Sequence, residues 1–133
     1  MKDKERKTTP RMSLGRMGED AACAFLEQRG HTVLERNCRK GHLEIDLVTL
    51  DTGGIHFVEV KSRVAPVSAR PEENVTRTKQ DRIARAALRY LHTSKDPRLL
   101  ADMEVSFDVV AVTFDKENVL VDWFPNAWIP LYV

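Results

Sequence analysis

The fold of this 133-residue chain is decided by residues 43–62, which read LEIDLVTLDTGGIHFVEVKS. Two apolar runs of β-type residues flank a Gly-Gly turn, and this pattern predicts a β-hairpin. With the loop at Thr52-Gly53, or over residues 51–54, Asp46 lies opposite Glu59 and Glu44 lies opposite Lys61. A loop at Gly53-Gly54 shifts the pairing by two residues, so these four side chains still share one face.

The hairpin therefore gathers three carboxylates and one ammonium group on one face, while the intervening residues form a buried face. Those expected buried residues are Leu43, Ile45, Leu47, Val58 and Val60. Opposed carboxylates destabilise a sheet and raise each other's pKa unless a cation compensates them. A bound divalent cation is one remedy. The alternative is a Glu44–Lys61 salt bridge with Asp46 and Glu59 solvated, worth roughly 0–1 kcal/mol.

Composition describes a globular protein, with 42% hydrophobic and 31% charged residues. No apolar run has the length of a membrane span, so we expect no membrane association and a cytoplasmic location. Cys23 and Cys38 lack metal-type spacing and are expected to be reduced thiols. From Lys61 to Arg89 there are eight basic and three acidic residues, and this positive segment suits a polyanionic substrate.

Along the chain, residues 1–12 are expected to form a flexible basic tail, and residues 13–133 a single domain. Ser13 is the predicted cap of a helix that ends near Arg29. The predicted strands are 31–38, the two hairpin strands, 104–114 and 119–124, with a flap-like loop over 63–71 and a second helix over 75–92. The apolar tail 125–133 is expected to pack on the domain or on a partner. The order αβββαββ predicts an α/β fold, a mixed sheet flanked by helices, with the 104–114 strand parallel to its neighbour.

Oxygen ligands from Asp46 and Glu59 suit Mg²⁺ or Mn²⁺. Glu19 falls at the edge of the apolar stripe of the first helix, where it either joins these ligands or is an ordinary rim glutamate. Lys61 could orient a metal-bound water or neutralise charge that develops on phosphorus, which is the chemistry of phosphodiester hydrolysis. The four histidines are scattered in the sequence, so we do not expect a zinc site or a nucleophilic histidine.

The second helix carries further candidate residues. Arg82, Arg85 and Arg89 form a basic stripe that either contacts phosphates or is simply solvated. Gln80 lies among the apolar positions, so it either bonds to backbone or reaches the reactive face. Arg63 and Lys79 complete the expected nucleic-acid-binding set.

These residues resemble a known family. The pattern of Asp46 followed by Glu59-Val60-Lys61, after a helix that carries a glutamate, is similar to the PD-(D/E)XK nuclease superfamily and to its Holliday-junction-resolvase-like branch. Gly15-Arg16-Met17-Gly18-Glu19, Lys79-Gln80 and Phe107-Asp108-Val109 add a closer resemblance to the YraN-like family of bacterial proteins. The resemblance covers about residues 14–114.

The resemblance implies a three-layer restriction-endonuclease-like core. It also implies a metal site of Asp46, Glu59 and Glu19, with Lys61 as the catalytic lysine and with Glu44 and Gln80 as accessory positions. The leading hypothesis is a Mg²⁺- or Mn²⁺-dependent deoxyribonuclease that acts on branched or single-stranded DNA. The alternatives are a catalytically silent nucleic-acid-binding module and a protein-interaction domain that uses the apolar tail. Junction resolution would favour a homodimer.

Overall fold

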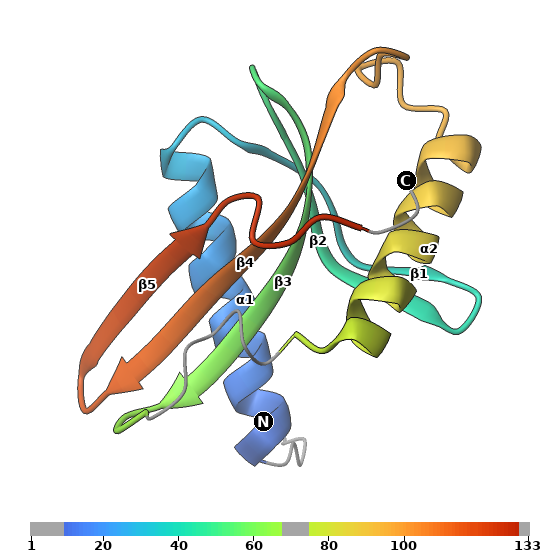
Figure 1. The fold of residues 1–133 in the computed structure, drawn as a ribbon. Coiled ribbons are helices and arrows are strands. Elements are labelled where there is room, and N and C mark those ends of the chain that lie inside the picture. The colour runs from blue at the N-terminus through green and yellow to red at the C-terminus, as the bar shows by residue number, and fades with distance from the viewer. Residues whose placement is uncertain (1–9, 68–74, 131–133) are drawn as a thin grey trace, which may run out of the picture.

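The computed structural model describes residues 10–67 and 75–130, which form two helices and five strands (Figure 1). In chain order the elements are α1 (Pro10–Gln28), β1 (Thr32–Lys40), β2 (Leu43–Asp51), β3 (Gly54–Val64), α2 (Arg77–Thr93), β4 (Glu104–Asp115) and β5 (Asn118–Phe124). This confirms the predicted order αβββαββ and the α/β class, and it is consistent with a restriction-endonuclease-like fold. Neither described helix is long and apolar enough to cross a membrane.

The five strands form one mixed sheet in the order β1-β2-β3-β4-β5. Neighbouring strands are antiparallel except β3 and β4, which pair in parallel from Gly54 with Glu104 to Val64 with Phe114. The crossover that contains α2 joins these two strands, because a parallel pair cannot be joined by a tight turn. The predicted parallel strand is therefore confirmed.

One helix covers each face of the sheet, which gives three layers (Figure 1). On one face α1 buries Ala22 and Leu26 against Leu47, Val58 and the centre of β4. On the other face α2 packs against the hairpin. The buried residues of this second cluster include Ile45, Val48, Phe57, Ile83, Ala87 and Tyr90. The hairpin is thus enclosed from both sides.

The hairpin has the predicted register at its turn, where Asp51 pairs with Gly54 and Leu47 with Val58. The β2–β3 ladder ends there, and Asp46 belongs to neither the β2–β3 ladder nor the β1–β2 ladder. Beyond that point β2 stays paired with β1, so Glu44 lies opposite Arg39 and not opposite Lys61.

The prediction of one shared buried face for the hairpin was wrong. Ile45 packs on the α2 side and Leu47 on the α1 side, although regular alternation would place both on one face. The alternation therefore changes phase at Asp46. A side-chain contact replaces the lost ladder there, because the backbone amide of Val60 donates to Asp46 Oδ2 at 2.9 Å.

Two predicted boundaries also change. The first helix begins at Pro10 and not at Ser13, in keeping with the preference of proline for the first turn of a helix. Residues 1–9 of the predicted tail lie outside the described residues. Arg63 and Val64, expected in the flap-like loop, extend β3 because its parallel ladder with β4 continues to Val64. Residues 68–71 of that loop also lie outside the described part of the chain.

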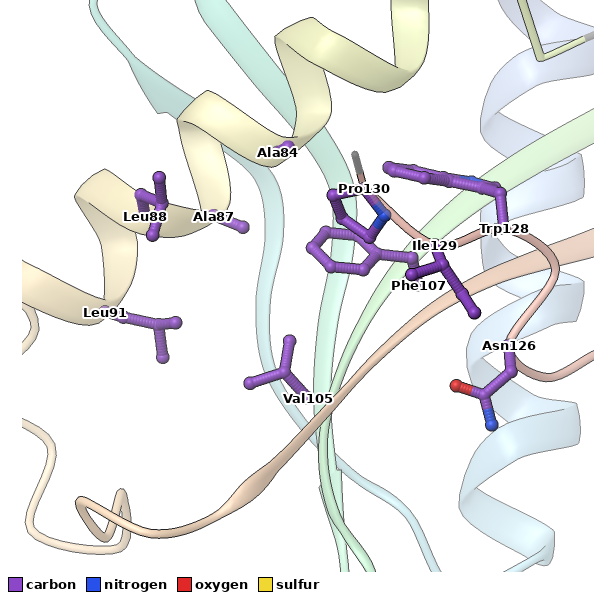
Figure 2. A pocket seen from close by; sticks show the side chains of 10 residues that line it. All are labelled: Ala84, Ala87, Leu88, Leu91, Val105, Phe107, Asn126, Trp128, Ile129 and Pro130. Atoms are coloured by element: carbon purple, nitrogen blue, oxygen red, sulfur yellow. The ribbon is translucent and has the colours of Figure 1, made fainter. Parts of the chain in front are cut away.

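The segment after β5 packs on the domain, as one of the two expectations had it. Trp128 lies against Phe107 with ring centroids 4.5 Å apart, and the amide of Ala127 donates to the carbonyl of Phe107 at 2.8 Å. Together with α2 this segment borders an apolar hollow of about 190 Å³ (Figure 2). Ile129 remains 79% exposed. Residues 131–133 of the predicted tail lie outside the described residues.

Candidate functional site

The candidate site is a hollow of about 750 Å³ at the end of the hairpin where β2 leaves β3. Four elements contribute to its lining, which consists of Leu14, Gly15 and Glu19 from α1, Asp46 from β2, Glu59, Val60, Lys61 and Ser62 from β3, and Lys79 from α2. An adjoining hollow of about 440 Å³ shares Asp46, Glu59 and Lys79 and adds Glu44 and Arg82. The two hollows together place carboxylates and basic groups along one continuous depression.

Asp46 of β2 has no ladder partner, and the hydrogen bond from the amide of Val60 holds its carboxylate. Burial of its carboxyl group, reinforced by the negative charges of Glu59 and Glu19, raises the pKa of Asp46 to about 7, although the hydrogen bond from Val60 opposes the rise. Two further carboxylates thus lie close enough to Asp46 to disfavour its charged form. This crowding is what the sequence predicted for the cluster, with Glu19 in the position expected for Glu44.

Glu59 is the most buried member of the cluster, at 6% exposed, and two ammonium groups neutralise it. Lys79 Nζ lies 2.5 Å from Glu59 Oε2, and Lys61 Nζ lies 3.6 Å from the same oxygen. Burial and the nearby charge of Lys79 lower the pKa of Lys61. Burial acts to lower the pKa of Lys79 too, but its hydrogen bond and ion pair with Glu59 outweigh burial and raise it.

Glu19 reaches the same hollow from α1. Its Oε1 accepts a hydrogen bond from Asn37 Nδ2 at 3.2 Å and lies 3.9 Å from Arg36 Nη2. These contacts from β1 fix Glu19 at the rim of the site. Asp46, Glu59 and Glu19 therefore supply oxygen atoms from three elements to one space, and this donor set fits a hard divalent cation.

The other predicted site residues fall into three groups. Glu44 lines the adjoining hollow but its Oε2 faces Arg39 Nη2 at 3.9 Å, so it does not pair with Lys61. Gln80 is structural, because its Nε2 donates to the carbonyl of Val75 at 3.0 Å. Arg63 Nε donates to Thr113 Oγ1 at 3.3 Å.

Basic residues of α2 border the site. Arg82 lines the adjoining hollow, Arg85 is exposed, and Arg89 Nη1 donates to the carbonyl of Lys40 at 3.3 Å. Lys79 was predicted as a nucleic-acid contact, whereas the structure places it inside the carboxylate cluster. Residue type and helical spacing do not separate Lys79 from the arginines that follow it, because it is the packing of α2 that brings its ammonium group to Glu59.

A second polar cluster was missed by the sequence reasoning, which treated the histidines as scattered. His31 and His56 lie side by side with ring centroids 4.6 Å apart. His56 Nε2 lies 3.0 Å from Asp51 Oδ1, and His56 Nδ1 lies 2.8 Å from Asp108 Oδ2. His56 and Asp108 each interrupt an apolar strand. A polar residue within each of these two apolar runs was the signal that the sequence offered.

The histidines and carboxylates of this second cluster shift one another's pKa values. Burial lowers the pKa of His31, with the neighbouring His56 acting in the same direction. For His56, burial acts to lower the pKa, but the hydrogen bonds and charges of Asp108 and Asp51 raise it overall. Burial acts to raise the pKa of Asp108 and Asp51, but hydrogen bonds from His56 and from other neighbours outweigh burial and lower both values. His56 thus lies between the carboxylates of Asp51 and Asp108.

Comparison with known proteins matches residues 18–112 to a family model described as Uncharacterised protein family UPF0102. The chain is 38% identical over 117 residues to a UPF0102 protein of Bacteroides thetaiotaomicron, covering 88% of this chain and 93% of that protein. It is 39% identical over 121 residues to a UPF0102 protein of Syntrophotalea carbinolica, covering 91% and 95%. A UPF0102 protein of Oleidesulfovibrio alaskensis is 44% identical over 102 residues, which span 77% of this chain and 48% of that relative. The residues of both polar clusters, apart from those contributed by β5 and the segment after it, lie in the matched region.

Proposed function

The chain belongs to Uncharacterised protein family UPF0102, the YraN-like family that its sequence resembles, and on this premise we propose that it is a metal-dependent endonuclease that acts on DNA. The observation that carries the proposal is the meeting of Asp46, Glu59 and Glu19 in one hollow with Lys61 beside them. The residues present fit a divalent cation, because Asp46, Glu59 and Glu19 offer carboxylate oxygen atoms to one hollow.

Asp46 and Glu59 would hold Mg²⁺ or Mn²⁺, with Glu19 contributing from the rim. When bound, such a cation lowers the pKa of a coordinated water and polarises a phosphoryl oxygen. Lys61 would orient the attacking water or neutralise charge that develops on phosphorus. Arg82 extends the positive charge along the depression and would bind a flanking phosphate.

A cleavage panel tests this proposal with branched, flapped, single-stranded and duplex DNA, each with Mn²⁺, with Mg²⁺ and with EDTA. We expect metal-dependent cleavage that favours branched or single-stranded DNA and falls at least about 100-fold in Asp46→Asn and in Lys61→Met. The matched controls are Asp102→Asn and Lys95→Met, which change exposed residues of the same types. Cleavage in EDTA, or equal cleavage by Asp46→Asn and the wild type, would contradict the proposal.

One contact favours a second candidate, a DNA-binding module of the same fold that does not cleave. The ammonium group of Lys79 already neutralises Glu59 at 2.5 Å. In this case DNA binds without cleavage under every metal condition, and its affinity falls steeply with salt. Arg82→Ala and Arg85→Ala would each reduce the salt slope by about 1 if each arginine contacts one phosphate.

A further inference from the structure

The second polar cluster has the arrangement of a metal site that is distinct from the carboxylate hollow. His31 precedes β1, Asp51 ends β2 and His56 lies near the start of β3. One ligand atom from each of these three residues lies within 4.8 Å of the others. Residues far apart in sequence thus converge at the end of the sheet where β2 turns into β3.

The distances from Asp51 to the two histidines suit a shared small cation. His31 Nε2 lies 3.4 Å from Asp51 Oδ2, and His56 Nε2 lies 3.0 Å from Asp51 Oδ1. Two ligands of a tetrahedral zinc ion with bonds of 2.0–2.1 Å are about 3.3 Å apart. The carboxylate of Asp51 therefore already stands at ligand-to-ligand distance from both rings.

Each proposed ligand is also oriented by a second group. The other ring nitrogen of His31 faces Thr49 Oγ1 at 2.9 Å, and the other ring nitrogen of His56 faces Asp108 Oδ2 at 2.8 Å. Asp108 is itself fixed, because its carboxylate accepts from Trp123 Nε1 at 3.0 Å and from the amide of Asn126 at 3.1 Å. A carboxylate behind a histidine is the usual support of a histidine that binds zinc.

An unpartnered atom points into this space. The side chain of His31 is only 1% exposed, and its Nε2 atom has no hydrogen-bond partner among the described residues. Its nearest acidic group, Asp51, already accepts hydrogen bonds at Oδ1 from the amides of Gly53 and Gly54. A cation between His31 and Asp51 Oδ2 would satisfy both atoms.

We propose that His31, Asp51 and His56 bind a divalent transition metal of the zinc type. Two imidazoles and one carboxylate prefer Zn²⁺ over Mg²⁺, whose ligands are oxygen atoms. A hollow of about 200 Å³ borders Asp51 and His56 and leaves room for a water as the fourth ligand. This site would tie the starts of β1 and β3 to the end of β2, with support from β4 and β5.

The test titrates Zn²⁺ and Co²⁺ into the full chain that carries Asp46→Asn and Glu59→Gln, so that the carboxylate hollow cannot contribute. Calorimetry should give one equivalent of Zn²⁺, Co²⁺ should give the visible absorption of a four-coordinate nitrogen and oxygen site, and Zn²⁺ should raise the Tm. Excess Mg²⁺ should not displace either ion. This test does not depend on whether the chain cleaves DNA.

Variants at the ligands decide the proposal. His31→Asn and Asp51→Asn should each weaken Zn²⁺ binding on the order of 100-fold, whereas His92→Asn, a change at an exposed histidine, should leave it unchanged. Asp51→Asn keeps an oxygen for the amides of Gly53 and Gly54, so it stays informative even if His31→Asn does not fold. Absence of stoichiometric Zn²⁺ binding, or equal affinity in Asp51→Asn, would overturn the proposed site.

Discussion

Asp46 shows how one residue without a ladder partner can place its side chain in the candidate site. It belongs to neither neighbouring ladder, its carboxylate accepts the amide of Val60, and its neighbours Ile45 and Leu47 pack on opposite faces of the sheet. Asp46, Glu59 and Lys61 line one hollow, as predicted, although the period-two alternation on which the prediction rested breaks at Asp46. The alternation could not predict this break, because nothing in residues 43–47 marks a change of phase.

Asp46→Asn should separate stability from function. Asparagine keeps an oxygen for the amide of Val60 but carries no charge beside Glu59 and Glu19. Because the folded pKa of Asp46 is about 7, well above 3.8, ionisation at pH 8 opposes folding. We expect the free energy of unfolding at pH 8 in EDTA to rise by about 1–2 kcal/mol while Mn²⁺ binding weakens at least about tenfold. Urea denaturation and calorimetry measure the two effects, and a clear loss of stability would show that the buried charge is not unfavourable.

Lys79→Met should have the opposite effect on stability. The substitution keeps the aliphatic stem but leaves the buried carboxylate of Glu59 with Lys61 at 3.6 Å as its remaining cation. We expect the free energy of unfolding to fall by about 1–2 kcal/mol at low salt, a value discounted because Lys79 is itself partly exposed. Adding Glu59→Gln should restore most of the loss, and Lys95→Met should cost nothing. A loss that persists in the double variant would point to packing and not to charge.

Cys38 gives a pH dependence in the alkaline range. Burial, with the neighbouring Glu35 acting in the same direction, raises the pKa of this thiol from 9.0 to about 11. The unfolded chain therefore releases the proton first, so stability is fully present below pH 9 and is lost as the pH rises toward 11. We expect the stability deficit of Cys38→Ala to shrink between pH 9 and 11 in urea denaturation. A deficit that stays constant over that range would contradict the assignment.

At the scale of elements, the contact between α1 and β3 positions Glu19 over the hairpin. Gly18 makes the contact possible, because a Cβ atom there would lie 1.7 Å from Ser62 Oγ and 2.8 Å from Ser62 Cβ. The closeness to Ser62 was not predictable, since it depends on how α1 crosses the sheet.

Gly18→Ala should push α1 away from β3. We expect a loss of about 1–3 kcal/mol of stability from overpacking, with partial recovery when Ser62→Gly is added. Gly15→Ala is the matched control, because a Cβ there meets nothing within 4 Å, and it should gain about 0.5–1 kcal/mol from helix propensity. Thermal denaturation compares the variants, and equal effects at the two positions would contradict the close contact.

The molecule as a whole was largely predictable because its signals are periodic and local. Hydrophobic alternation and turn residues predicted all seven elements, and the helical crossover predicted that the 104–114 strand is parallel to its sheet neighbour. The histidine cluster was not predictable in the same way. His31, Asp51 and His56 are brought together by the register of β1, β2 and β3, and sequence spacing alone does not encode that register.

The parallel seam between β3 and β4 also has a consequence for the kinetics of folding. Every pair along it joins residues fifty positions apart, from Gly54 with Glu104 to Val64 with Phe114. The other ladders join strands that are connected by short turns. Closing this seam carries the largest loop-closure cost, so we expect it to limit the folding rate. In stopped-flow experiments Val110→Ala, inside the seam, should slow folding, whereas Val121→Ala in β5 should mainly speed unfolding. The time at which β1–β3 pair with β4–β5 would then determine how long the hairpin carboxylates stay exposed before α2 packs beside them.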